Sequence, residues 1–250
     1  MTISIIIAHD DRRGDALLNR CINSIEHDQD YEIVVESKGN VSEARNNAIH
    51  RSHGDILILV DDDAVFRANC IQELFLPFID DSVGIVGGVN IAFPEMDYLT
   101  TLSASMFSSP FFFGRSVARY TPRGNLRESD EGEIISCVMA IRRTAFDKTK
   151  GFPVDCIPCE ENLLINEIQS LGYRVLYNPF AIVYHDRPSL FIPYLKKIYR
   201  YGYGRGKLMK MKKGKMRMVW SFNKNWLYYS VMFPLHCLSY LYGVLKGYFQ

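Results

Sequence analysis

A chain of 250 residues is long enough to bury a substantial hydrophobic core without disulfides or a structural metal. With 48% hydrophobic and 23% charged residues it has a globular composition, which excludes intrinsic disorder, collagen-like repeats and a polytopic membrane protein. The net charge of +1 conceals an uneven distribution. Residues 1–187 hold 17 basic and 28 acidic residues, whereas residues 188–250 hold 12 basic residues and no acid, so the two parts are expected to meet different partners.

The first hundred residues alternate predicted strands and helices. Continuous apolar runs at 3–8 and 56–60, with a further strand at 31–35, indicate strands buried on both faces of a parallel sheet. Apolar residues at helical spacing predict a helix over 18–25, and Ser42 can cap a helix that runs to residue 49. This order predicts an open, mostly parallel α/β sheet flanked by helices.

Residues 91–133 are weakly periodic, and regular patterns return after them. A helix is predicted over 160–171, with Gly172 at its C-cap position. The other predicted elements are a strand at 134–141, a short helix at 144–148 and short strands at 175–177 and 182–184, the last of which ends at His185.

Ligands of open α/β sheets bind outside the carboxyl ends of the strands. Three polar clusters follow predicted strands: His9-Asp10-Asp11-Arg12, Glu36-Ser37-Lys38 and Asp61-Asp62-Asp63. Clustered carboxylates repel one another, and a protein keeps them chiefly where a cation or a cationic substrate offsets the repulsion. An exposed turn is the alternative interpretation of the Asp triplet.

Two further signals lie later in the chain. Glu160 and Glu161 begin a predicted helix, where the macrodipole favours the ionised carboxylate, although acids are common in first turns. His185 closes a short strand, and a single histidine of this kind is more often structural than a ligand. The three signals strengthen one another when they are taken together.

These residues resemble glycosyltransferase family 2 in order and spacing over about residues 3–205. The resemblance rests on Ile3–Ala8, Glu36, Ala44-Arg45-Asn46-Asn47, Gly54–Asp63, Glu160-Glu161, Gly172-Tyr173-Arg174, Asn178-Pro179 and Val183-Tyr184-His185. It implies a GT-A fold in residues 1–187, with a nucleotide-binding half at 1–90 and an acceptor half at 91–187. It also implies transfer of a sugar from a nucleotide-sugar to a hydroxyl acceptor with inversion at the anomeric carbon.

The resemblance assigns roles residue by residue. Asp61-Asp62-Asp63 takes the place of the family's D-x-D motif, in which Asp63 would hold a divalent cation and Asp61 the ribose side of the nucleotide. His185 matches the histidine that reaches the cation or diphosphate. The remaining nucleotide-sugar contacts would come from Ala8, His9, Asp10, Glu36, Arg45 and Asp62, with Glu36 against the base ring.

The second residue of Glu160-Glu161 matches the family's general base. The family more often has Asp there, and the longer Glu side chain leaves Glu160 as a rival for the role. The first loop also departs from the family, because Ala8-His9-Asp10-Asp11 replaces the usual Pro-Thr-Tyr-Asn. This departure affects the expected contacts to the nucleobase.

The chemistry of sugar transfer independently requires these groups. Breaking the bond to a nucleoside diphosphate leaves negative charge on phosphate oxygens, which Mg²⁺ or Mn²⁺ held by a carboxylate such as Asp63 would neutralise. Inversion requires a carboxylate that takes the proton of the attacking hydroxyl, and Glu161 is the candidate. A nucleotidyltransferase is the rival enzyme, but it normally has a glycine-rich phosphate loop that is missing after the first strand. A binding scaffold with an inactive site is the non-enzymatic alternative.

Residues 188–250 form a basic, aromatic tail. Residues 226–245 carry no formal charge and include Trp226 and several tyrosines, which suits an interfacial or re-entrant anchor beside a basic segment. This predicts a peripheral or monotopic protein at the cytoplasmic face of a membrane. It also predicts a lipid-linked glycan or polysaccharide as acceptor, in the synthesis of a glycolipid, glycan or exopolysaccharide. A helix pair packed on the catalytic domain is the alternative, and no motif for nucleic-acid binding accompanies the basic residues.

Six scattered cysteines do not indicate a disulfide framework, and Met1 is followed by a predicted strand without a signal peptide, so a reducing cytoplasmic setting is expected. Cys156-Ile157-Pro158-Cys159 matches the spacing of redox and zinc half-sites, but no second pair completes a zinc ligand set. Two loop cysteines without such a role are the alternative interpretation.

Overall fold

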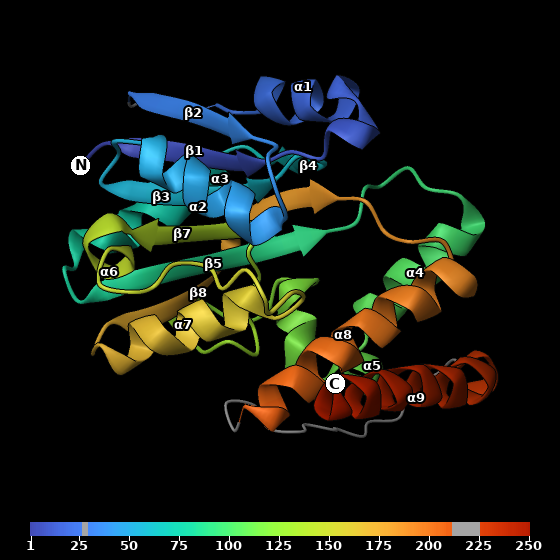
Figure 1. Cartoon of the computed structure of the whole chain (residues 1–250). Coiled ribbons are helices and arrows are strands. Elements are labelled where there is room, and N and C mark those ends of the chain that lie inside the picture. Colours follow the sequence, from blue (N-terminus) through green and yellow to red (C-terminus); the bar gives the residue numbers. More distant parts are fainter. Residues whose placement is uncertain (27–29, 212–225) are drawn as a thin grey trace. The chain divides into compact units, whose positions relative to one another are not determined.

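The computed structural model describes residues 1–26, 30–211 and 226–250, which form two compact units (Figure 1). The first unit comprises Met1–Ala92, Ala118–Val154 and Glu160–Asp186. The second comprises Phe93–Val117, Asp155–Cys159 and Arg187–Gln250. The sequence-based division at residue 187, and the two halves expected within residues 1–187, stay predictions.

The first unit is built on one sheet of eight strands. Its order is β2-β1-β3-β7-β5-β8-β4, and β6 pairs with β8. The strands β2, β1, β3, β5 and β8 run in one direction, and β7, β4 and β6 run against them. The strands are β1 (Ile3–Ala8), β2 (Tyr31–Glu36), β3 (Ile56–Asp61), β4 (Ala64–Phe66), β5 (Val83–Ile91), β6 (Arg127–Glu128), β7 (Val138–Arg142) and β8 (Arg174–His185). The mostly parallel α/β sheet is therefore confirmed.

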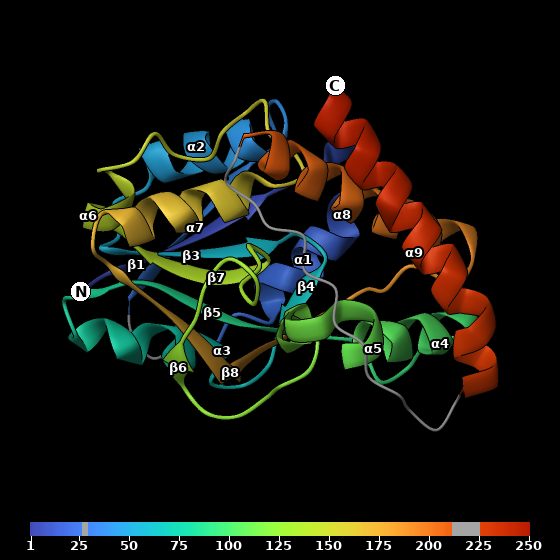
Figure 2. The same cartoon turned by 90° about the horizontal axis from the view of Figure 1, so that it is seen from below.

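Helices cover both faces of this sheet. Alternate residues of each strand point to opposite sides, so the continuous apolar runs present apolar side chains to the helices on both faces. Ile5 and Ile7 of β1 pack in one core with α1 (Asp15–Asn23) and α3 (Cys70–Phe75). Ile6 packs in the other core with α2 (Val41–Arg51) and α7 (Glu160–Ser170), and Figure 2 shows these two helices side by side on one face. Burying each isoleucine contributes about 1.5–3 kcal/mol, so the continuous apolar runs specify strands enclosed on both sides.

The remaining helical segments are divided between the two units. The first unit contains the 3-10 helices Asp11–Arg13 and Leu76–Ile79 and the helix α6 (Arg143–Phe146). The second unit contains α4 (Tyr98–Phe107), α5 (Pro110–Phe113), α8 (Ile192–Lys210) and α9 (Trp226–Phe249), and a 3-10 segment spans Gly114–Arg119.

Several expected element boundaries were wrong. Asn40, not Ser42, caps α2, because its side chain accepts from the amides of Ser42 and Glu43 while Glu43 bonds back to the Asn40 amide. The two short strands at 175–177 and 182–184 are parts of the single strand β8, which continues through Asn178 with an irregular register against β5. The strand expected at 134–141 begins only at Val138, and the short helix expected at 144–148 is Arg143–Phe146.

In the second unit α8 and α9 pack with their backbones in close contact. A Cβ on Gly202 or Gly206 of α8 would meet the carbonyl oxygen of Tyr240 or Val244 at 2.0 Å. The same relation holds in reverse for Gly243 of α9, whose Cβ would meet the Tyr199 oxygen at 2.2 Å. Glycine at these positions is what allows the approach. In the described part of the chain, we find no helix with the length and apolar character needed to span a membrane.

Candidate active site

The sheet brings three predicted site residues to one edge. In the parallel register Ala8 at the end of β1 lies opposite both Glu36 at the end of β2 and Asp61 at the end of β3. Parallel strands end at the same edge, so the polar residues that follow them gather there. The expectation that the three clusters meet at the carboxyl ends of the strands is therefore met by the register.

His185 reaches the same place through strand pairing. The antiparallel pair β4–β8 places Ala64 opposite His185, and Asp63 directly precedes Ala64. As a result the Nε2 atom of His185 lies 3.3 Å from Oδ1 of Asp63 and 3.5 Å from Oδ2 of Asp61. The His185 Nδ1 atom lies 2.8 Å from the backbone oxygen of Asp186, which fixes the orientation of the ring.

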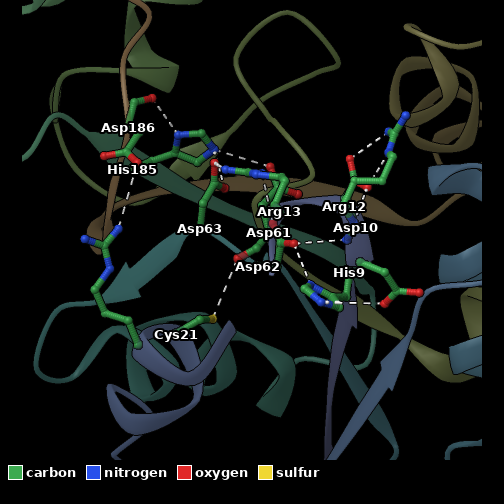
Figure 3. A network of polar contacts seen from close by, with 12 residues as sticks. His9, Asp10, Arg12, Arg13, Cys21, Asp61, Asp62, Asp63, His185 and Asp186 are labelled. Atoms are coloured by element: carbon green, nitrogen blue, oxygen red, sulfur yellow. Dashed lines mark hydrogen bonds and ion pairs between the residues drawn. The ribbon is translucent and has the colours of Figure 1, made fainter. Parts of the chain in front are cut away.

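The loop after β1 folds over the Asp triplet (Figure 3). Asp62 is buried, and its Oδ2 atom lies 2.8 Å from Nδ1 of His9 and accepts from the Asp10 amide at 3.1 Å. Arg13 donates to Oδ1 of Asp62 at 3.1 Å and to Oδ2 of Asp63 at 2.6 Å. The guanidinium thus offsets part of the repulsion between neighbouring carboxylates. Sequence reasoning missed Arg13, although its position just after the β1 loop cluster was a usable signal.

Arg45 links the Asp triplet to the start of α7. Its buried guanidinium donates to Oδ1 of Asp61 at 3.0 Å and to Oε1 of Glu160 at 3.1 Å. Burial, together with the neighbouring Glu161 carboxylate, raises the pKa of Glu160 to about 7 in spite of Arg45. Glu160 can therefore exchange a proton near neutral pH, while Glu161 follows it on α7 with a partly exposed side chain.

Glu36 is held in its ionised form at the edge of the sheet. The Lys38 amide, together with the Ser37 amide and the Arg51 guanidinium at 3.0 Å, holds the pKa of Glu36 below its ordinary value. The backbone oxygen of Glu36 also accepts from the His9 amide at 2.9 Å. The β1 loop is therefore tied to β2 as well as to the Asp triplet.

The donor set at this edge fits a divalent cation. Ligand atoms of Asp61, His185 and Cys137 lie within 4.8 Å of one another, and one oxygen of Asp63 lies beside the same imidazole. Carboxylate oxygens with an imidazole suit Mn²⁺ or Mg²⁺, whereas a thiol suits softer ions. Cys137 is buried and accepts from the Asn90 side chain at 2.8 Å. It was missed from the sequence because it lies just before β7, without a polar neighbour motif.

The site therefore connects residues from five separate segments of the chain. His9, Asp10 and Arg13 contact Asp62 or Asp63, His185 lies beside Asp61 and Asp63, and Arg45 joins Asp61 to Glu160. Acids, two histidines and two arginines thus surround one edge of the sheet. Such an arrangement can bind a cation together with an anionic ligand and can move a proton at Glu160 or Glu161.

Comparison with solved structures shows the fold. The chain is similar to the mannosyltransferase PcManGT from Pyrobaculum calidifontis in complex with GDP-Man and Mn²⁺, with a TM-score of 0.61 and 15% identity over 98% of this chain and 72% of that one. It is also similar to S. aureus TarS 1-349 in complex with UDP-GlcNAc, with a TM-score of 0.56 and 13% identity over 87% of this chain and 68% of that one. These likenesses confirm the GT-A fold.

Sequence comparison gives the family. A search of curated proteins finds no match. The family model described as Glycosyl transferase family 2 matches residues 2–150, which is more than half of the chain and includes β1, α2, the Asp triplet and β7. This match and the GT-A fold agree, and the chain belongs to glycosyl transferase family 2.

Proposed function

We propose that the protein is an inverting glycosyltransferase that moves a sugar from a nucleotide-sugar to the hydroxyl of an acceptor. The observation that carries the proposal is the network in which Arg45 joins Asp61 to Glu160 while His185 lies beside Asp61 and Asp63. The reaction needs side chains that bind a cation, side chains that contact a diphosphate and a carboxylate that accepts a proton. Side chains of these kinds lie at one edge of the sheet. The neighbours in complex with GDP-Man and UDP-GlcNAc support a nucleotide-sugar donor.

The donor side of the reaction falls to the strand ends. Asp61 would hold the ribose and Glu36 would face the base, with Ala8, His9, Asp10 and Asp62 forming the rest of the nucleotide contact. Asp63 and His185 would hold Mg²⁺ or Mn²⁺, which when bound neutralises charge on the diphosphate as a Lewis acid. Arg13, which already donates to Asp62 and Asp63, has the charge to contact phosphate oxygens as well.

The acceptor side falls to the start of α7. Glu161 would take the proton from the acceptor hydroxyl as its oxygen bonds to the anomeric carbon and the bond to the diphosphate breaks on the opposite face of the sugar. Glu160 is the alternative base, since its pKa of about 7 suits proton transfer near neutral pH. Arg45 would keep Glu160 in position and is a positioning residue in this scheme.

We further propose that the second unit binds a membrane surface and that the acceptor is lipid-linked. Helix α9 exposes large apolar side chains at helical spacing, and Tyr242 among them also packs its ring against Tyr199 of α8. These side chains are Leu235, Leu238, Leu241, Tyr242, Leu245, Tyr248 and Phe249. The basic side chains of α8 and the lack of any acid in residues 188–250 give a charge that complements anionic lipid. Holding the enzyme at the bilayer would raise the effective concentration of a lipid-linked acceptor.

A thermal-shift screen of nucleotide-sugars with and without Mn²⁺ tests the donor site. We expect one donor to raise the melting temperature, with a larger rise when Mn²⁺ is present. The anomeric configuration of the product, followed by proton NMR, then tests inversion. A protein stabilised by no nucleotide-sugar would contradict the donor site. Binding without transfer of the sugar to an acceptor or to water would favour an inactive scaffold. Release of pyrophosphate from a nucleoside triphosphate, with transfer of its nucleotide to a sugar phosphate, would favour a nucleotidyltransferase.

A further inference from the structure

The C-x-x-C motif is a close pair of thiols in the second unit. The Sγ atom of Cys159 lies 3.5 Å from Sγ of Cys156 and 2.8 Å from the Cys156 backbone oxygen. The Cys159 amide also donates to that oxygen at 2.8 Å, so a tight turn holds the two sulfurs together. A disulfide has an S–S length of about 2.05 Å, so closure requires an approach of about 1.5 Å, within the range of side-chain rotation.

The chemistry of the pair suits thiol–disulfide exchange. A structural zinc site is built from Cys and His ligands. The thioether of Met211 lies 3.6 Å from Sγ of Cys156, and a thioether is not a zinc ligand of that kind. Two neighbouring thiols without a metal can instead be oxidised reversibly to a disulfide.

The other cysteines offer an internal contrast. Burial raises the pKa of Cys21 to about 12 and raises that of Cys70 still further, so both stay as thiols in the folded protein. Burial also raises the pKa of Cys237. A protonated thiol is a poor nucleophile, and Cys21 and Cys70 therefore serve as references within the same chain.

We propose that Cys156 and Cys159 are a dithiol–disulfide couple that exchanges with low-molecular-weight disulfides such as oxidised glutathione. Cys156 gives up its proton and attacks one sulfur of the small disulfide, which breaks that bond, forms a mixed disulfide and releases one small thiol. Cys159 then gives up its proton, attacks the Cys156 sulfur and releases the second small thiol. The pair loses two electrons and two protons, and the small disulfide gains them.

The geometry also assigns the order of attack. Cys156 is 7% exposed and Cys159 only 1%, so an incoming disulfide reaches Cys156 first and Cys159 resolves the adduct. The peptide after Cys159 leads directly into Glu160 and Glu161. The couple therefore directly precedes, in the sequence, the two acids at the start of α7. Its thiol chemistry does not depend on the proposed transferase activity.

The test uses the full chain, equilibrated anaerobically with mixtures of reduced and oxidised glutathione, then acid-quenched, unfolded, alkylated and mapped by mass spectrometry. We expect a Cys156–Cys159 disulfide to form in the wild type while Cys21 and Cys70 remain alkylatable. Cys159→Ser should accumulate the glutathione adduct at Cys156. Cys156→Ser should form an adduct at Cys159 about tenfold more slowly or not at all. Cys237→Ser should behave like the wild type.

Circular dichroism of each variant verifies that it is folded before the rates are compared. The couple would be refuted if the folded wild type kept both thiols at every glutathione ratio while the urea-unfolded chain formed the disulfide. The assigned order would be refuted if Cys156→Ser reacted as fast as Cys159→Ser. Neither result depends on any sugar donor or acceptor, so failure here is distinct from failure of the proposed function.

Discussion

One terminal nitrogen of the Arg45 guanidinium lies 3.1 Å from Oε1 of Glu160, and the other lies 3.0 Å from Oδ1 of Asp61. One buried cation thus holds a carboxylate of the Asp triplet and a carboxylate of α7 at a fixed separation. Residue 45 and residue 160 come from distant parts of the sequence, so this bridge ties the donor side of the proposed site to its acceptor side. Charge–charge contacts of this kind are strong only because the guanidinium is enclosed.

Replacing Arg45 with Met should therefore destabilise the protein far more than a similar change on the surface. The substitution leaves the carboxylates of Asp61 and Glu160 without their cation, which for a buried pair costs about 3–5 kcal/mol. Arg51→Met on the same helix removes an exposed guanidinium that pairs with Glu36 and should cost at most about 1 kcal/mol. Urea unfolding measures both. Equal losses of stability in the two variants would show that Arg45 does not tie Asp61 to Glu160.

The role of the two acids at the start of α7 can be separated by isosteric substitution. Glu161→Gln should lower the rate of sugar transfer by about 10²–10⁴-fold, because the amide cannot accept the proton of the acceptor. Nucleotide binding should not change. Glu167→Gln on the same helix is the matched control and should keep full activity. The measurement is kcat together with the Kd of the nucleoside diphosphate. A normal rate for Glu161→Gln with a large loss for Glu160→Gln would assign the base to Glu160.

The raised pKa of Glu160 predicts how stability changes with pH. The folded pKa of about 7 exceeds the ordinary glutamate pKa of 4.5, so the folded state keeps a proton that the unfolded state has already lost between these pH values. The stability contributed by this proton is complete below about pH 4.5 and is lost as the pH rises through about 7. The loss amounts to at most about 3 kcal/mol.

Glu160→Gln should remove this dependence, since the amide does not titrate. The free energy of unfolding of the wild type should therefore fall relative to that of Glu160→Gln between about pH 5 and pH 8, with Glu167→Gln following the wild type. Urea titrations across this range provide the comparison. A difference between wild type and Glu160→Gln that does not change with pH would show that Glu160 has an ordinary pKa.

Much of the donor side of the site could be predicted from the sequence because strand ends can be located from apolar runs. The run at 56–60 fixes where Asp61 emerges, and the parallel order of β1, β2 and β3 then brings Ala8, Glu36 and Asp61 together. His185 could be placed only through the family resemblance. Its position depends on the pairing of β4 with β8, and the three residues of β4 are too short a pattern to predict.

The bridging residues were harder to anticipate. The family motif drew attention to Arg45, but its simultaneous contact with Asp61 and Glu160 depends on how α2 and α7 pack on the same face of the sheet. Arg13 and Cys137 were missed for a similar reason. Each residue joins the site through three-dimensional packing. The spacing of residues along the sequence does not reveal such contacts.

The contact between Arg13 and Asp63 predicts competition with a bound cation. Because the guanidinium occupies one Asp63 oxygen at 2.6 Å, Arg13→Ala should tighten the binding of Mn²⁺ alone by several-fold, whereas Asp63→Asn should weaken it by about tenfold or more. Arg12→Ala is the control, since Arg12 is exposed and pairs with Asp10. Free Mn²⁺ measured by electron paramagnetic resonance reports the affinity without any turnover. Equal affinities for wild type and Asp63→Asn would place the cation elsewhere.

The outward face of α9 predicts binding to anionic vesicles. We expect the wild type to float with phosphatidylglycerol vesicles and much less with neutral phosphatidylcholine vesicles, and to be released by high salt, because both apolar burial and charge contribute. Replacing Leu238, Leu241 and Leu245 together with Ser should weaken binding by tenfold or more. These side chains are 64%, 45% and 48% exposed, so their loss should leave the fold intact.

Ile79→Ser provides the control for this experiment, because Ile79 is 87% exposed in the first unit and lies on a separate element. It should float as the wild type does. The comparison distinguishes a defined lipid-binding face from general stickiness of apolar surface. If Ile79→Ser weakened flotation as much as the triple α9 variant, or if the triple variant floated like the wild type, α9 would not be the lipid-binding face. The case for a lipid-linked acceptor would then lose its support, while the donor-site residues at the edge of the sheet would be unaffected.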